Sequence, residues 1–358
     1  MRMSERICRI TAAVFAVVMS IFGTAATCTR ITRIVSSGEG SAAAHLSMAN
    51  HDVSSDVDII ANVKTSTDKD NNNKNKNTYT NLYKDTDDTV STDIDRTGEK
   101  TYLVTETMYR ESNMTCGNFY VKNATDIALD LNGYLAADLP FEKEKTTLPQ
   151  VLVVHTHTTE SYMDSDLGYY YESYEPSNDN DEYNVVRVGD EICESLKQHG
   201  VTALHCRKHH NEPSYLGAYD CCAESINDYL AQYPSLKIVL DIHRDSIMTD
   251  DGERIKPTFE YAGQKAAQIM IMCGNDNNGY FDFPNWQQNM SLAVKLQSIA
   301  ETNYPGMTRP LSFGNFMYNM NLAPGSLLIE VGTDANTLDE AVLSGRLLGD
   351  VLAQVLSN

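Results

Sequence analysis

Beyond about residue 100, the 358-residue chain alternates between short apolar runs and longer segments in which apolar residues recur at helical spacing. Four of the short runs are apolar on successive residues, as expected for strands that are covered on both faces of a sheet. They lie at 151–155, 237–243, 267–273 and 327–331. Strands separated by helices predict an α/β fold, here a single domain with a mainly parallel twisted sheet covered by helices on both faces.

Helices are predicted between these strands. Apolar residues from Val185 to Leu196 lie on one face of a helix. The same spacing predicts three more helices, at 217–233, 285–303 and 337–356, and the last opens with residues spaced as a capping box. The mixed segment 102–150 is expected to add a strand and a helix packed against the main sheet. The predicted domain therefore spans 101–358, with its core at 149–358.

The first hundred residues have a different composition. Residues 1–9 carry three arginines and precede an uncharged apolar run at 10–27. Basic residues hold the start of such a run on the cytoplasmic side, which predicts a cytoplasmic n-region followed by a membrane anchor or signal segment. Residues 28–100 are rich in Ser, Thr, Asn, Asp and Lys and predict a disordered extracytoplasmic linker, because they bury too little apolar surface to fold. We therefore expect a single-pass protein of the cell membrane with an extracytoplasmic domain.

Charge and cysteine content narrow the class of protein. The formal net charge of −21 repels a phosphate backbone and argues against nucleic acid as a partner. The eight cysteines form no CxxC pair, so they do not predict a cysteine zinc cluster. None lies in a recognisable nucleophile setting, which disfavours a catalytic thiol.

Candidate metal ligands follow the first predicted strand. It runs straight into a polar cluster that holds His155, His157 and Glu160. In open α/β sheets, ligands bind just beyond the carboxyl ends of strands. His157 and Glu160 form an HxxE pair that can aim an imidazole and a carboxylate at one ion, and His243 ends the next strongly apolar strand. Three such ligands and a water make a hydrolytic zinc site, although a lone histidine at a strand end is more often structural.

Glu330 is the candidate catalytic residue. It lies inside the otherwise apolar run 327–331, where an unpaired carboxylate is costly to bury. It therefore needs either a partner, for which Arg244 and Arg309 are candidates, or a catalytic reason to be there. As a general base it would take a proton from the attacking water and pass it to the leaving amine.

Several segments between residues 149 and 341 resemble those of the stage II sporulation protein P family, among them PQVLVVHTHTTESY, PSYLGAYD, DIHRDS and LLIEVGTDANTLDEA. The resemblance implies a fold related to the zinc N-acetylmuramoyl-L-alanine amidases. It implies amidase activity on the link between stem peptide and muramic acid, with probable endopeptidase activity on crosslinks. It also implies septal wall thinning and engulfment during sporulation, in the space between mother cell and forespore membranes. The implied partners are peptidoglycan and the stage II sporulation proteins D and M.

Carried over by position, the resemblance gives a Zn²⁺ site of His157, Glu160 and His243 with Glu330 catalytic. In the related amidases the carboxylate ligand opens a helix, which here points to Asp181 or Glu182 as the alternative.

Further site candidates follow from location near predicted strand ends or from charge: His155, Arg244, Asp245, Asn275, Arg309 and Asn319. Arg244 or Arg309 could pair with a stem-peptide carboxylate through a bidentate fork. Tyr215 and Tyr219 are candidates to line a glycan groove.

The sequence thus predicts a membrane-anchored, zinc-dependent hydrolase of amide bonds in peptidoglycan. Two alternatives stay open at this point. One is a zinc carboxypeptidase that acts on stem peptides. The other is a non-catalytic module that binds the wall.

Overall fold

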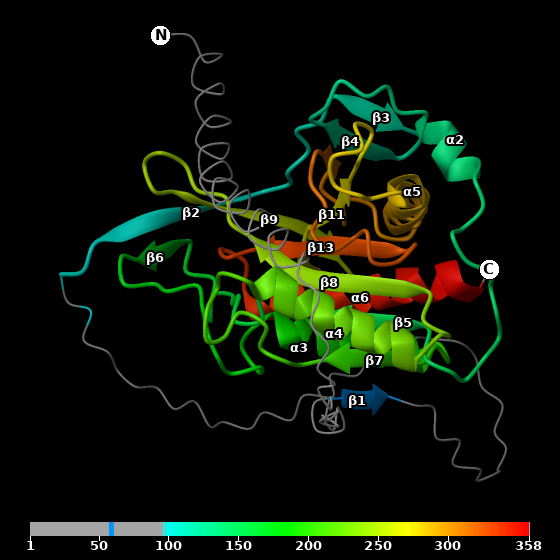
Figure 1. The fold of residues 1–358 in the computed structure, drawn as a ribbon. Coiled ribbons are helices and arrows are strands. Elements are labelled where there is room, and N and C mark those ends of the chain that lie inside the picture. The colour runs from blue at the N-terminus through cyan, green and yellow to red at the C-terminus, as the bar shows by residue number, and fades with distance from the viewer. Residues whose placement is uncertain (1–56, 61–95, 97, 358) are drawn as a thin grey trace, which may run out of the picture. The chain divides into compact units, whose positions relative to one another are not determined.

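The computed structural model describes residues 57–60, 96 and 98–357 (Figure 1). Over these residues, the main sheet has nine strands in the order β1-β7-β5-β8-β13-β11-β12-β4-β3. In that order they are β1 (Val57–Ile60), β7 (Ala203–Cys206), β5 (Val151–Val154), β8 (Ile238–Asp245), β13 (Ser326–Thr333), β11 (Ile269–Gly274), β12 (Leu311–Gly314), β4 (Phe119–Asn123) and β3 (Met114–Cys116). The central strands β7, β5, β8 and β13 run parallel, whereas β11 runs antiparallel to β13. The predicted α/β fold with a mainly parallel sheet is confirmed.

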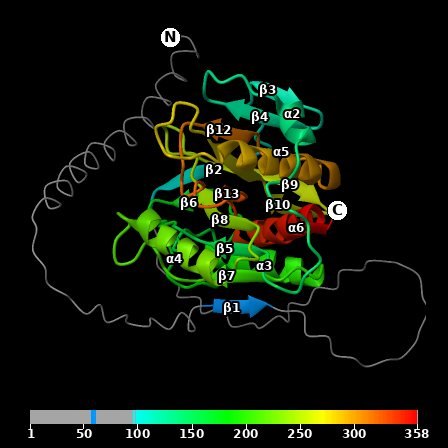
Figure 2. The same cartoon turned by 45° about the vertical axis from the view of Figure 1, so that its right-hand side comes forward.

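Helices cover both faces of this sheet (Figure 2). They are α3 (Val185–Gln198), α4 (Ala218–Gln232), α5 (Trp286–Asn303) and α6 (Leu338–Ser357). Successive side chains of β5 point to opposite faces, so Leu152 packs with Ile226 of α4 while Val153 packs in the core that contains Ile192 of α3. All four residues of β5 are buried as a result.

Side-chain caps fix where two of the helices begin. Asn184 accepts a hydrogen bond from the backbone N–H of Val186 at 2.9 Å and so caps α3. At the start of α6, the N–H of Thr337 donates to Glu340 Oε2 at 3.1 Å, and the N–H of Glu340 donates to Thr337 Oγ1 at 3.3 Å. This reciprocal pair is the capping box that the sequence predicts.

A second sheet was not predicted from the sequence. It contains, in the order β10-β9-β2-β6, the strands β10 (Gln264–Ala267), β9 (Arg254–Tyr261), β2 (Thr101–Thr107) and β6 (Tyr169–Tyr171). The segment 102–150 is therefore divided: β2 belongs to the second sheet, β3 and β4 extend the main sheet, and α2 (Leu131–Ala136) packs against α5. This division depends on strand partners that are far away in the sequence.

The localisation expected from the sequence needs a correction. In the region for which the structure gives positions, no helix is both long and apolar enough to cross a bilayer, so single-pass anchoring is not supported. The segments 1–9 and 10–27 on which that expectation depended lie outside the described residues. The expected linker 28–100 also lies largely outside them, and β1 is the part of it that pairs with the main sheet.

Lys256 of β9 links the second sheet to α6. Its side chain is 1% exposed, and its Nζ lies 3.0 Å from Glu340 Oε1 and 2.8 Å from Asp166 Oδ2. A buried ion pair adds little net stability, but removing one partner leaves an uncompensated charge.

Lys256→Met is therefore expected to lower the free energy of unfolding by about 3–5 kcal/mol, because the buried Glu340 loses its cation. Lys265→Met is the matched control. Lys265 contacts Asp166 as well, but its side chain is 45% exposed, so its loss should cost less than about 1 kcal/mol. Chemical denaturation of both variants measures the difference, and equal losses would contradict the buried role of Lys256.

Candidate metal centre

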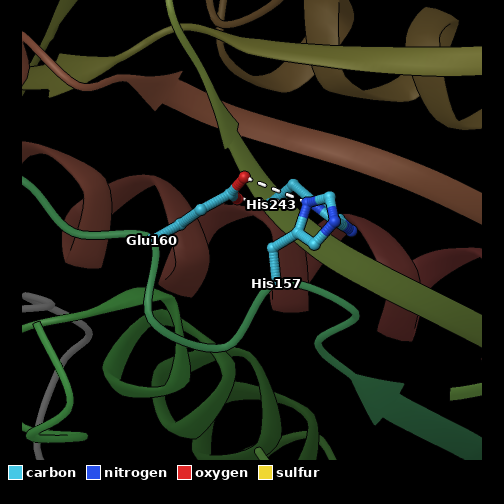
Figure 3. A group of neighbouring side chains, drawn as sticks. All are labelled: His157, Glu160 and His243. Atoms are coloured by element: carbon cyan, nitrogen blue, oxygen red, sulfur yellow. Dashed lines mark ion pairs between the residues drawn. The ribbon is translucent and has the colours of Figure 1, made fainter. Parts of the chain in front are cut away.

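The candidate metal ligands lie on the turn that follows β5 and on the neighbouring strand β8 (Figure 3). The N–H of Glu160 donates to the carbonyl of His157 at 3.1 Å, which closes the turn. Asp241 of β8 holds this turn against the sheet, since it accepts hydrogen bonds from Thr156 N at 2.8 Å and from Thr156 Oγ1 at 2.6 Å. The parallel pairing of β5 with β8 thus brings the turn next to His243.

His157, Glu160 and His243 point toward one another. Glu160 Oε1 lies 3.4 Å from His157 Nδ1, and Glu160 Oε2 lies 3.2 Å from His243 Nδ1. One possible ligand atom from each of the three residues lies within 4.8 Å of the others. Two imidazole nitrogens and one carboxylate oxygen at this separation form a donor set that suits Zn²⁺ with one position left open.

Charge within this group favours ionised carboxylates. Burial by itself raises the pKa of Glu160, but the positive charge of His243 and hydrogen bonds from both histidines outweigh it, and the pKa is lowered. Burial likewise lowers the pKa of His243, but Asp241 and Glu160 outweigh it, and the pKa is raised. His243 Nε2 lies 3.0 Å from Asp241 Oδ1, so His243 has one ring nitrogen toward Glu160 and the other toward a second carboxylate. This contact is an ion pair without hydrogen-bond geometry, but it puts Asp241 next to the nitrogen whose carboxylate partner orients a metal-binding histidine.

Glu330 of β13 lies beside this group, because its Cα is the register partner of the Cα of His243. Burial, reinforced by the negative charge of Asp245, raises the pKa of Glu330 to about 8. Its Oε2 is buried and has no hydrogen-bond partner among the described residues. The guanidinium of Arg309 instead pairs with Asp245 at 2.7 Å, and that of Arg244 donates to backbone carbonyls. The sequence left open whether an arginine neutralises Glu330, and neither of these two forms an ion pair with it.

The three candidate ligands and Glu330 line one pocket of about 300 Å³. Other side chains that line it are Tyr215, Tyr219, Arg244, Asp245, Ser246, Met272, Tyr318 and Leu328. Of the additional candidates from the sequence, the structure brings Arg244, Asp245, Tyr215 and Tyr219 to this pocket.

The remaining candidates lie outside its lining. His155 is fully buried, with Nδ1 2.9 Å from the carbonyl of Ile242 and Nε2 2.8 Å from His205. Arg309 does not line the pocket, but it forms an ion pair with Asp245, which does. Asn319 donates from Nδ2 to the carbonyl of Tyr219.

Asn275 follows β11, which runs antiparallel to β13, so it lies toward the amino end of β13, whereas Glu330 is near the carboxyl end. It donates to the carbonyl of Gly314.

The alternative carboxylates, Asp181 and Glu182, do not line the pocket. Asp181 Oδ1 lies 2.8 Å from His209 Nε2, away from the two candidate histidines, and Glu182 is exposed. The carboxylate next to both histidines is Glu160.

Sequence reasoning missed Asp241 and Tyr318. A signal was available for Asp241, because it precedes His243 by two residues in a strand and must therefore share its face of the sheet. No local signal pointed to Tyr318, which reaches the pocket from the loop between β12 and β13.

Comparison with known proteins gives matches of two kinds. The family model of stage II sporulation protein P matches residues 30–353. Stage II sporulation protein P of Bacillus subtilis (strain 168) is 28% identical over 216 residues, which cover 57% of this chain and 50% of that protein. The chain thus spans about half the length of this relative.

Solved structures give matches at low identity. An N-acetylmuramoyl-L-alanine amidase of Nostoc punctiforme is 14% identical, with a TM-score of 0.33, over 58% of this chain and 94% of that chain. An N-acetylmuramoyl-L-alanine amidase of Clostridium difficile 630 is also 14% identical, with a TM-score of 0.36, over 59% of this chain and 95% of that chain.

Proposed function

Because this chain belongs to the stage II sporulation protein P family, we propose that it is a zinc-dependent hydrolase of amide bonds in peptidoglycan that acts during sporulation. The proposed reaction is that of an N-acetylmuramoyl-L-alanine amidase, with endopeptidase activity on crosslinks as a second activity. Peptidoglycan is the proposed substrate, and the stage II sporulation proteins D and M are the proposed partners. The observation that carries the proposal is the group of His157, Glu160 and His243 beside Glu330, whose Oε2 is buried and has no hydrogen-bond partner among the described residues.

His157, Glu160 and His243 would hold the Zn²⁺ ion. The ion would supply Lewis acidity at the scissile carbonyl and lower the pKa of a water. The pocket beside these residues has a volume of about 300 Å³, at the lower end of the range for small-molecule sites. Asp241 would keep the His243 ring in place through its contact with Nε2.

Glu330 would act as the general base. Its Oε2 makes no hydrogen bond to the described residues, so the oxygen is free to accept a proton from the attacking water. Register with His243 places the carboxylate next to the candidate ligands. The same oxygen would then return the proton to the leaving amine, which completes the cleavage.

Incubation of the full chain with purified sacculi tests the proposal, with and without a zinc chelator, and mass spectrometry identifies what is released. Zinc-dependent release of intact stem peptides is the expected result. Release of single amino acids would instead indicate a carboxypeptidase. Binding to sacculi without any release, by a folded and zinc-loaded protein, would indicate a wall-binding module and overturn the proposal.

Asp241→Asn is expected to weaken Zn²⁺ binding by about 10–100-fold, as for other residues that orient a metal-binding histidine. Competition with a chromophoric chelator measures the affinity. Because Asp241 also holds the turn through Thr156, Thr156→Val serves as the control: it loses the hydroxyl contact but keeps the carboxylate beside His243. If both variants bind Zn²⁺ equally weakly, Asp241 acts by holding the turn and not by orienting the histidine.

A further inference from the structure

Tyrosine rings form one side of the pocket, next to the candidate histidines. Tyr219 and Tyr318 stack with ring centroids 5.4 Å apart and an angle of 26° between their planes. The ring of Tyr219 is also nearly parallel to that of His243, at 6.5 Å and 12°. Phe316 stacks on Tyr318 at 5.1 Å. Tyr219 and Tyr318 are partly buried and both line the pocket, so part of each ring faces it.

The backbone holds Tyr318 in an unfavourable conformation. Its φ is +44°, and that of Asn319 is +59°. A left-handed conformation is uncommon for residues other than glycine and is strained for an aromatic one. Such strain persists only where the surrounding structure imposes it, and it concentrates at functional sites. Here Asn319 Nδ2 donates to the carbonyl of Tyr219 at 2.8 Å and ties the loop to the first turn of α4.

The pocket has a different chemical character beside Glu160. Arg244, Asp245 and Ser246 also line the pocket, and Arg244 Nη1 lies 4.0 Å from Glu160 Oε1. The candidate metal centre therefore has aromatic rings against its histidines and the guanidinium of Arg244 next to its carboxylate. A substrate with an apolar ring face on one side of the scissile bond and a peptide on the other would match this asymmetry.

We infer that Tyr219 and Tyr318 bind the sugar ring next to the scissile amide, so that the peptide lies toward Arg244 and Asp245. This inference rests on the proposed function and adds the orientation of its substrate. The C–H face of a pyranose packs on an aromatic ring, while its hydroxyl groups stay in solvent at a partly exposed position such as this one. Tyr318 is thus a specificity-determining residue for substrates that carry the sugar.

Two probes that differ only in the sugar test the inference: N-acetylmuramoyl-L-alanyl-D-isoglutamine and its sugar-free counterpart D-lactoyl-L-alanyl-D-isoglutamine. Binding of each is measured by calorimetry on the full chain carrying Glu330→Gln, and hydrolysis of each is measured on the chain with Glu330 intact. Tyr318→Asn removes the ring while suiting the left-handed backbone. Tyr318→Phe keeps the ring, and Tyr280→Ala removes an exposed tyrosine outside the pocket lining.

Tyr318→Asn is expected to weaken binding of the muramyl probe about tenfold and to leave the sugar-free probe within about twofold. Hydrolysis of the muramyl probe should change through KM more than through kcat, as for binding shared by ground and transition states. Tyr318→Phe should keep the preference for the sugar, and Tyr280→Ala should change neither probe.

Equal weakening of both probes in Tyr318→Asn, or no weakening of either, would overturn the inference, as would a protein that binds neither probe. The proposed function fails separately. If the chain with Glu330 intact hydrolyses neither probe, but binding still favours the muramyl probe and this preference depends on Tyr318, the sugar site is supported and the proposed activity is not. If hydrolysis proceeds and Tyr318→Asn leaves the preference unchanged, the activity stands without the sugar site.

Discussion

Glu330→Gln is expected to reduce zinc-dependent release of stem peptides by about 10²–10⁴-fold, the range that a positioned general base contributes. Glutamine has the same shape as glutamate but cannot take up a proton from the attacking water. Zn²⁺ content should be unchanged, because Glu330 is not one of the three candidate ligands. Initial rates on sacculi and the metal content of the same preparation are the two measurements.

Stability gives an independent check on this variant. Burial raises the pKa of Glu330 to about 8 from its ordinary value of 4.5. A carboxyl whose folded pKa is raised costs stability as the pH rises from its unfolded pKa toward its folded pKa, because the folded state disfavours the ionised form. At pH 7, the metal-free Glu330→Gln protein should therefore be at least as stable to denaturant as the parent protein.

The matched control is Glu224→Gln, which makes the same chemical change on the exposed part of α4. It should leave the rate of release unchanged. A Glu330→Gln protein that binds Zn²⁺ and keeps more than a tenth of the parent rate would contradict the role of Glu330 as the base.

His243→Ala should have the other large effect. Loss of a residue that only orients a metal ligand weakens metal binding by up to about 100-fold. Removing one of the three ligands themselves should therefore weaken Zn²⁺ binding by more than that. Release of stem peptides should fall to the level seen with a chelator. Competition titration gives the affinity, and metal analysis of the purified protein gives the occupancy.

His209→Ala is the control for removing a histidine, because His209 pairs with Asp181 and lies outside the pocket lining. Asp181→Asn decides between the two possible carboxylate ligands. If Glu160 is the third ligand, Asp181→Asn keeps its zinc. Loss of zinc in Asp181→Asn, or full zinc binding by His243→Ala, would show that the centre is built from other residues.

Much of the fold could be predicted because local sequence reports burial directly. The runs that form β5, β8, β11 and β13 are apolar on successive residues. This pattern is typical of strands whose two faces are both covered. In α3, the buried residues recur at helical spacing, and Asn184 supplies the cap. These features depend on neighbouring residues alone, so they need no knowledge of strand partners.

The candidate ligands could also be named from the sequence, since polar residues after buried strands are conspicuous. What the sequence could not decide was which strand ends meet. Because β11 runs antiparallel, Asn275 at its end lies away from Glu330 of β13, although both strands were correctly predicted. The second sheet, which is formed by strands distant in the chain, escaped prediction for the same reason.

The sequence by itself determined the central strands, the main helices and the residues His157, Glu160, His243 and Glu330 as candidates, because burial pattern and residue chemistry are local properties. Only the tertiary structure decided that Glu160 and not Asp181 lies beside both histidines, that neither Arg244 nor Arg309 pairs with Glu330, and that Tyr318 reaches the pocket. These outcomes depend on contacts between segments that are distant in the chain, such as Glu160 with Arg244 and Tyr219 with Tyr318, which strand pairing and packing select and no local pattern records.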